Sequence, residues 1–146
     1  MSRLRVSVVL DAPPAVVWED VRHVASHVEW MTDAVAIRFL TDQVEGVGTT
    51  FDCDTRIGPF RLTDRMEITR WDPGSAMGVR HVGLVTGTGE FRLRAKRKGR
   101  TTFSWTERLE FPWWMGGAVG SWAATPVLTL VWRHSMRTLA ARFAAG

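Results

Sequence analysis

Apolar and polar residues alternate along the middle of the chain, from residue 34 to residue 111. In residues 51–57 the alternation is regular, with Phe51 and Cys53 set against Asp52. Successive side chains of a β-strand point to opposite faces of its sheet, so a period of two indicates strands with one buried face and one wet face. The pattern therefore predicts an antiparallel sheet with a single dry face.

Turn residues divide this region into runs that we expect to be separate strands. Glycine and proline supply the turns, as at Gly58-Pro59 and Asp72-Pro73-Gly74. Seven strands are predicted, over residues 3–11, 34–41, 49–57, 60–71, 75–82, 87–96 and 101–111.

Two short helices are expected between the first and second strands. The first begins at Ala12-Pro13-Pro14, because proline is tolerated in a first helical turn, and the second covers residues 26–30. A longer helix is predicted over residues 126–143, where Thr125-Pro126 resembles a capped start. Its apolar stripe consists of Leu128, Val131, Trp132, Ser135, Leu139 and Phe143, and its opposite side carries Arg133 and Arg137.

The dry face of the sheet needs a cover, and only the final helix is long enough to provide one. The predicted fold class is therefore α+β, with a curved seven-stranded antiparallel sheet, two short helices and a long C-terminal helix that covers a cavity. The 146 residues form one domain of ordinary size. The composition is 45% hydrophobic and 23% charged, which excludes a disordered chain.

Other features bear on the location of the protein. A single cysteine, Cys53, excludes an internal disulfide framework, and the apolar run at residues 6–10 is too short for a signal peptide. We therefore expect a cytoplasmic protein. Residues 111–132 contain no charge and are long enough to span a bilayer, but glycine and proline interrupt them. The prediction there is a loop followed by the helix that starts at residue 126.

Basic residues gather in the last predicted hairpin. The net charge is +4, and no acidic residue occurs between Glu90 and Glu107. Six of the 19 basic residues lie there: Arg92, Arg94, Lys96, Arg97, Lys98 and Arg100. A solvated strand face is the first interpretation, and transient contact with anionic lipid headgroups is the second, with Trp113 and Trp114 as an aromatic anchor. Nucleic-acid binding is disfavoured, because this face offers few aromatic side chains for base stacking.

The inward register predicts which side chains line the cavity. The sheet positions are Phe51, Cys53, Phe60, Leu62, Met66, Met77, Val79, Phe91, Leu93, Phe103, Trp105 and Leu109. The final helix adds Leu128, Val131 and Ser135. Walls of aromatic, aliphatic and sulfur-containing side chains suit a planar or lipidic ligand. The alternative for each residue is that it simply fills a core.

Three ionisable residues share this inward register: Asp64, His81 and Glu107. A buried carboxylate is costly unless it is paired or hydrogen-bonded, and burial in a cleft also moves pKa values into a catalytic range. The three residues are therefore candidates for acid–base catalysis or for hydrogen bonding to a ligand. The alternative is that each lies near a strand end, in contact with solvent.

No metal and no cofactor are predicted. Glu19, His23 and His27 repeat at four-residue spacing, which would align them on one helix. The sequence lacks an HExxH pattern and the chain is expected to bend near His23, so we interpret these residues as a solvated face. Gly87-Thr88-Gly89 lacks the third glycine of a nucleotide-binding fingerprint.

Local motifs support a family resemblance. Residues 11–18, 28–30 and 46–49 read DAPPAVVW, VEW and GVGT. They resemble the first strand-to-helix junction, the end of the second helix and the second turn of the START-related, Bet v 1-like (SRPBCC) superfamily, in its branch of polyketide cyclases, dehydrases and lipid-transport proteins. The resemblance implies a helix-grip fold with an internal cavity for an apolar or aromatic molecule. This superfamily includes enzymes, carriers and sensors on one scaffold.

Three functions follow as hypotheses. The first is a carrier or sensor that binds a hydrophobic or aromatic small molecule, such as a lipid or a polyketide-like compound. The second is a cyclase, aromatase or dehydrase that uses Asp64, His81 or Glu107 to move protons. The third is a peripheral membrane protein that acts through Trp113, Trp114 and the basic hairpin. An enzyme needs two titratable groups close together and open to the cavity, whereas a carrier tolerates one or none.

Overall fold

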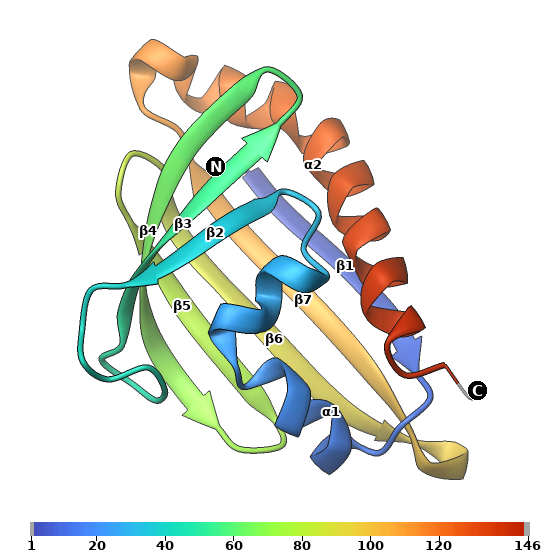
Figure 1. The fold of residues 1–146 in the computed structure, drawn as a ribbon. Coiled ribbons are helices and arrows are strands. Elements are labelled where there is room, and N and C mark those ends of the chain that lie inside the picture. The colour runs from blue at the N-terminus through green and yellow to red at the C-terminus, as the bar shows by residue number, and fades with distance from the viewer. Residues whose placement is uncertain (1, 145–146) are drawn as a thin grey trace.

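A strongly curved antiparallel sheet wraps around one long helix (Figure 1). The computed structural model describes residues 2–144. In chain order the elements are β1 (Ser2–Leu10), α1 (Pro14–Val21), η1 (Val24–Glu29), β2 (Ala34–Phe39), β3 (Thr50–Ile57), β4 (Phe60–Asp72), β5 (Ala76–Val82), β6 (Thr86–Lys96), η2 (Arg97–Gly99), β7 (Arg100–Glu110), η3 (Trp113–Met115) and α2 (Gly117–Ala141). This is the α+β helix-grip fold that the sequence predicts.

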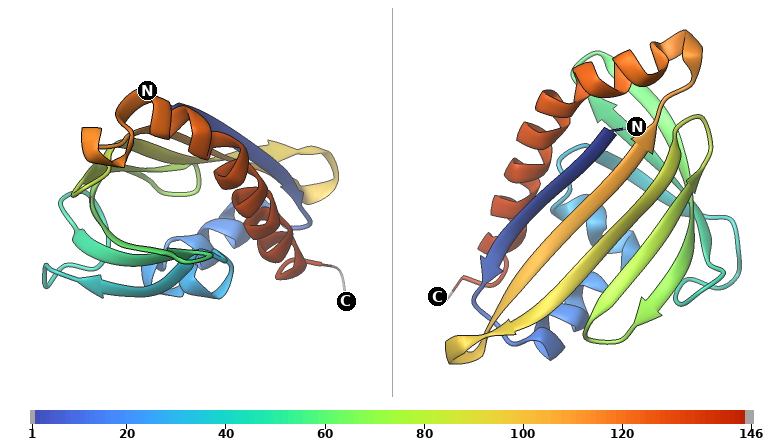
Figure 2. Two further views of the ribbon diagram at one scale, coloured as in Figure 1. Left: turned by 90° about the horizontal axis from the view of Figure 1, so that it is seen from above. Right: turned by 180° about the vertical axis from the view of Figure 1, so that it is seen from behind.

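The seven strands follow the order β1-β7-β6-β5-β4-β3-β2. Consecutive strands from β2 to β7 pair as antiparallel neighbours, and β1 completes the sheet by pairing with β7. The register shifts between Ala34 and Ala36 on β2 and between Ile68 and Arg70 on β4, and such bulges bend a sheet. Figure 2 shows the resulting half-barrel, with α2 lying along its open side next to β1.

An aromatic core joins the helices to the concave face of the sheet. Trp30, at the end of η1, is only 1% exposed, and its ring lies 5.8 to 6.3 Å from the rings of Phe91, Phe103 and Trp105. Trp105 also stacks on Trp132 of α2, with a distance of 4.4 Å between the ring centroids. These contacts attach η1 and α2 to the sheet and leave the concave face beyond them open for a cavity.

The final helix begins earlier than predicted. α2 starts at Gly117, so residues 117–125 are helical and do not form a loop, and Pro126 lies inside the helix. Gly116 has a φ of 96°, a left-handed conformation that glycine adopts without strain, and it turns the chain from η3 into α2. Proline removes one helical hydrogen bond, but burial of the inner face of α2, which includes Trp132, outweighs this local cost.

Candidate functional site

A cavity of about 780 Å³ lies between the concave face of the sheet, η1 and α2. Pockets of this size hold small organic molecules. The predicted wall residues that line it are Phe51, Cys53, Phe60, Leu62, Met66, Met77, Val79, Phe91, Trp105, Leu109 and Leu128. Phe60 stands at the rim, because it begins β4 at the β3–β4 turn and is 75% exposed. The wall is therefore largely apolar.

Four predicted wall residues lie outside the cavity: Leu93, Phe103, Val131 and Ser135. Leu93 and Phe103 are buried, but they face each other across β6 and β7 in the packed core, and Val131 packs against the same core. Ser135 accepts a 3.0 Å hydrogen bond from the backbone N–H of Thr32 and so attaches α2 to the chain before β2. Alternation specifies the face of a strand, but it does not specify where along the strand the cavity ends.

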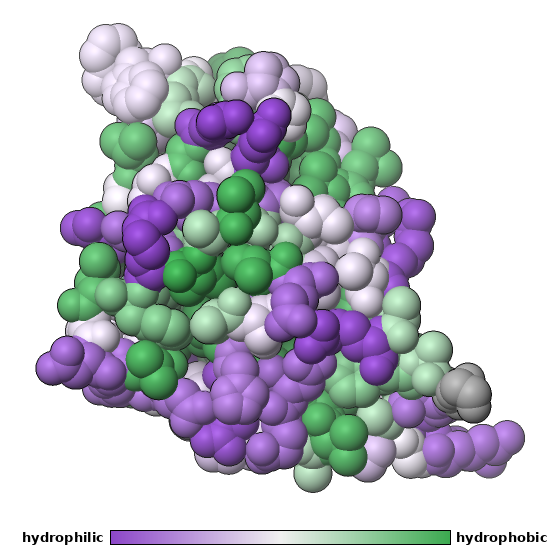
Figure 3. All heavy atoms as spheres, in the orientation of Figure 1, coloured by the Kyte–Doolittle hydropathy of each residue, from purple (hydrophilic) through white to green (hydrophobic). Residues whose placement is uncertain are grey.

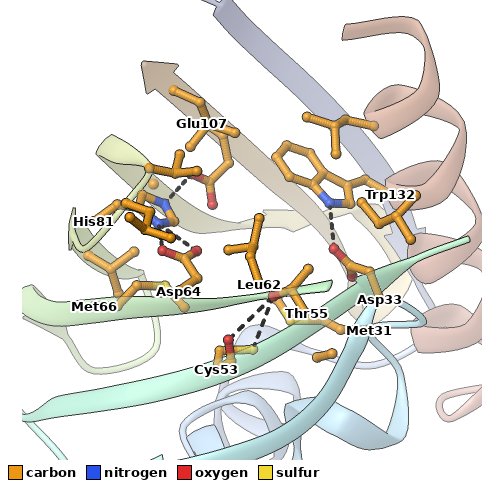
Figure 4. Close-up of a pocket in the computed structure, with 18 of the residues that line it drawn as sticks. Met31, Asp33, Cys53, Thr55, Leu62, Asp64, Met66, His81, Glu107 and Trp132 are labelled. Atoms are coloured by element: carbon orange, nitrogen blue, oxygen red, sulfur yellow. Dashed lines mark hydrogen bonds and ion pairs between the residues drawn. The ribbon is translucent and has the colours of Figure 1, made fainter. Parts of the chain in front are cut away.

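Asp64, His81 and Glu107 meet on the cavity wall, although they come from β4, β5 and β7 (Figure 4). Nδ1 of His81 lies 2.8 Å from Oδ2 of Asp64, and Nε2 of His81 lies 2.7 Å from Oε2 of Glu107. The indole N–H of Trp105 donates a 3.0 Å hydrogen bond to Oε1 of Glu107. The side chains of His81 and Glu107 are 4% and 6% exposed, and that of Asp64 is 16% exposed. The structure thus brings together the three residues that the inward register singles out.

A glycine on β6 makes this meeting possible. β6 lies between β5 and β7, and its register places Gly87 opposite His81 and Gly89 opposite Glu107. A Cβ atom at Gly89 would lie 2.5 Å from Oε1 of Glu107, closer than real Cβ contacts. Because Gly89 has no side chain, the carboxylate of Glu107 can reach His81 across the intervening strand. A Cβ atom at Gly87 would instead meet the backbone carbonyl oxygen of Arg108, so Gly89 is the position that accommodates the cluster.

The cluster is a charged one. Both ring nitrogens of His81 face carboxylates, so both are donors and the ring is an imidazolium. Desolvation lowers the pKa of His81, but the hydrogen bonds and negative charges of Asp64 and Glu107 outweigh it and raise this pKa to about 10. The imidazolium of His81 uses both of its N–H donors on the two carboxylates. The groups that the cluster can still offer to a ligand are therefore hydrogen-bond acceptors on the carboxylate oxygens.

Asp33 is a cavity residue that the sequence analysis missed. It lies between η1 and β2, and the indole N–H of Trp132 donates a 3.3 Å hydrogen bond to its Oδ2 atom. Burial raises the pKa of Asp33, and the negative charges of Glu107 and Asp64 add to the effect. Figure 4 shows Asp33 apart from the charged cluster, with Leu62 drawn between them. Periodicity predicts the facing of residues in helices and strands, and Asp33 lies in a connection between two elements, so no pattern in the sequence marked it.

His27 is buried, which corrects the prediction of a solvated face. Its Nε2–H donates a 2.7 Å hydrogen bond to the carbonyl oxygen of Val21, and its ring contacts Trp30 and Phe91. Desolvation lowers the pKa of His27 to about 4, so the ring is neutral. The chain bends at His23, between α1 and η1, and this bend turns His27 inward while His23 stays on the surface.

Cys53 lies on the cavity wall, and its thiol is unreactive. Burial raises the pKa of Cys53 to about 12, although the side chain of Thr55 interacts with the sulfur at 3.8 Å. A protonated thiol in this setting acts as a small apolar side chain.

Comparison with known proteins agrees with this fold. A family model described as polyketide cyclase/dehydrase and lipid transport matches residues 1–145. Among solved structures, the protein TTHA0849 from Thermus thermophilus is similar with a TM-score of 0.80 and 13% identity, over 97% of this chain and 96% of that one. The Zhui aromatase/cyclase from a Streptomyces species is similar with a TM-score of 0.72 and 19% identity, over 96% and 92% of the two chains. No curated protein matches the sequence.

Proposed function

The chain belongs to the polyketide cyclase/dehydrase and lipid-transport family, and we propose that it binds a hydrophobic or aromatic small molecule bearing a hydroxyl group, as a carrier or sensor. The observation that supports this proposal most is a largely apolar cavity with one buried charged cluster, Asp64–His81–Glu107, on its wall. Contacts with the apolar wall stabilise the bound ligand but do not fix its orientation, whereas the cluster orients one polar group of the ligand.

The polarity of the cluster favours a ligand hydroxyl over a ligand carbonyl. Both ring nitrogens of His81 are already used, so a carbonyl oxygen finds no free donor on this ring. Carboxylate oxygens have about four acceptor sites per group, and the contacts with His81 and Trp105 leave some of them for a ligand. An alcohol or phenol can donate to Asp64 or Glu107.

A displacement assay tests this proposal. The fluorescence of N-phenyl-1-naphthylamine rises in apolar surroundings, and its displacement would compare naphthalene with 2-naphthol, which differ by one hydroxyl group. A hydrogen bond to a charged group predicts that 2-naphthol binds roughly tenfold more tightly. Glu107→Gln should reduce this preference and leave naphthalene binding unchanged.

A substitution that partly fills the cavity tests whether the compounds bind inside it. Val79→Phe places a larger side chain on the cavity wall and should weaken binding of all three compounds, whereas Arg80→Gln changes the neighbouring exposed residue and should not. Wild-type protein that does not bind the fluorophore, or Val79→Phe that binds it equally well, would refute a ligand cavity.

A second candidate function is acid–base catalysis of cyclisation or dehydration. The observation that favours it is that Asp64 and Glu107 both lie within hydrogen-bonding distance of His81, and that all three titratable groups line the cavity. In a dehydration, a carboxylate of the cluster would remove a proton from a carbon beside a carbonyl group. The electron pair would form the carbon–carbon double bond, and the hydroxyl group would leave as water after taking the proton back.

A probe with a single acidic ring proton separates the enzyme from the carrier. When a base removes that proton from 5-nitrobenzisoxazole, the N–O bond breaks and a coloured cyanophenolate forms. An active base predicts that the wild-type protein opens this probe at least about a hundredfold faster than Glu107→Gln does. If the wild type and Glu107→Gln have equal thermal stability and open the probe at equal rates, the carrier or sensor function remains.

A further inference from the structure

The outer face of α2 is an exposed stripe that nothing in the described chain covers. A period of 3.6 residues places its members within one narrow arc of the helix: Val119, Trp122, Pro126, Leu130, Arg133 and Arg137. Val119, Trp122 and Leu130 are 73%, 78% and 64% exposed. Along the edge that α2 occupies, Figure 3 shows hydrophobic residues in the upper half and hydrophilic residues below them. The outer face is thus apolar in its first half and cationic in its second.

The tryptophans of η3 extend this apolar area. Trp113 is 86% exposed and Trp114 is 58% exposed, and η3 leads directly into α2 through Gly116. Indole rings prefer the boundary between hydrocarbon and water, where their apolar body and polar N–H are both satisfied. Exposed apolar areas of this kind mark interaction sites.

The charges on this surface have one sign. After Glu110 the sequence contains no acidic residue. Arg133 and Arg137 are exposed and form no ion pair with any residue of the described range 2–144. A partner for the outer face of α2 therefore has to supply both an apolar phase and negative charge.

We propose that η3 and the outer face of α2 dock this protein on an anionic lipid surface. The tryptophans and Leu130 would enter the boundary of the acyl chains, and Arg133 and Arg137 would contact the headgroups, as in interfacial amphipathic helices. The helix would lie along the surface, since no helix within residues 2–144 is long and apolar enough to cross a membrane.

A second copy of the chain suits this surface less well. In a two-fold dimer each copy presents the same patch, so the interface would contain the arginines of both copies. Because the outer face of α2 carries no carboxylate, those arginines would lose water without gaining a partner. An anionic lipid surface offers an apolar phase to the first half of the stripe and negative charge to the second half.

The proposed docking surface adjoins the cavity. Trp114, Ala123 and Val127 line the cavity at its α2 side, and Val127 is also 50% exposed. Docking would therefore bring the cavity rim to the lipid surface. The docking proposal does not depend on the identity of the ligand, because the side chains that it uses, apart from Trp114, do not line the cavity.

The tip of the basic hairpin lies at the opposite end of the molecule from η3. β6 and β7 pair from Thr86 with Glu110 at one end to Lys96 with Arg100 at the other, and η3 follows the Glu110 end (Figure 1). The two features that the sequence analysis combined into one membrane contact are therefore far apart. A contact through η3 and the outer face of α2 does not include the basic residues of β6 and η2, so the hairpin provides a charge-matched control.

Sedimentation with lipid vesicles tests the proposal. Wild-type protein should pellet with phosphatidylcholine vesicles that contain about one-third phosphatidylglycerol, and much less with phosphatidylcholine alone. The double variant Arg133→Gln/Arg137→Gln should lose about thirtyfold in partitioning to anionic vesicles. Arg94→Gln/Lys96→Gln removes the same net charge from the hairpin and should partition like the wild type.

A variant that lacks two exposed apolar side chains distinguishes a lipid surface from a second copy of the chain as the partner of this surface. Trp122→Ser/Leu130→Ser changes two exposed residues, so it should keep its thermal stability and its naphthylamine binding but lose vesicle binding. Absence of wild-type binding to anionic vesicles, or an equal loss in the hairpin variant, would overturn the proposal. A wild-type dimer in analytical ultracentrifugation that this variant converts to a monomer would also overturn it and would identify a second copy as the occupant.

Discussion

Raising the pH from about 6.5 to about 9 should destabilise this protein through His81. The ordinary pKa of this imidazole is 6.5, and in the folded protein Asp64 and Glu107 raise it to about 10 against the opposing effect of desolvation. A group whose pKa is raised by folding stabilises the folded state fully below its unfolded pKa. That stabilisation is lost as the pH rises toward the folded pKa, because the folded protein binds the proton that the unfolded chain has released.

The size of the effect follows from the two pKa values. The difference between 6.5 and about 10 corresponds to roughly 5 kcal/mol in the free energy of unfolding, of which about 3 kcal/mol should be lost between about pH 6.5 and about pH 9. The His81 side chain is only 4% exposed, so solvent screens the ion pairs little. The raised pKa of Cys53, about 12 against 9.0, acts mainly above that range, and the lowered pKa of His27, about 4, acts mainly below it.

Urea unfolding followed by tryptophan fluorescence, at several pH values in this range, measures the loss directly. His81→Gln cannot titrate, so its free energy of unfolding should stay flat where that of the wild type falls. His134→Gln removes an exposed histidine of α2 and should keep the wild-type slope. Parallel curves for wild type and His81→Gln would refute the reasoning, because they would mean that His81 does not hold its proton above neutral pH.

Three further outcomes are expected. Gly89→Ala should displace the Glu107 carboxylate and flatten the pH dependence of stability, whereas Thr88→Ala on the outer face should leave that dependence intact. Trp105→Ala should lower the free energy of unfolding by about 3–5 kcal/mol in urea, because its ring is buried and stacked on that of Trp132, and a smaller loss would mean that the site tolerates a void. Asp33→Asn should raise the melting temperature at pH 7 and not at pH 3, because burial raises the pKa of Asp33 and makes its charge unfavourable, and equal shifts would contradict this.

Much of the fold could be read from the sequence because it depends on backbone geometry. A strand repeats every two residues whatever surrounds it, so alternation in residues 51–57 and 60–71 was enough to predict β3 and β4 and their inward faces. The inner face of the final helix was predicted for the same reason, since Leu128 and Leu139 recur at the helical period and are buried. These features need only the local pattern of side chains.

The start of α2 and the position of His27 depended on tertiary contacts. Pro126 is a local signal for a helix start, but the helix extends back to Gly117, where its inner face continues along the sheet and the cavity. The sequence predicted the bend near His23 but also a solvated His27, whereas the structure places His27 against Trp30 and Phe91. In both cases burial of apolar surface outweighed a local preference.

The sequence by itself determined that Asp64, His81 and Glu107 point inward, because register is a property of each strand. Only the tertiary structure decided that they touch. Contact between His81 and Glu107 requires β5, β6 and β7 to be neighbours and requires the strand between them to have no side chain at Gly89. Pairing between strands is a long-range choice, made by the burial of the whole sheet against α2, and the periodicity of one strand contains no information about it.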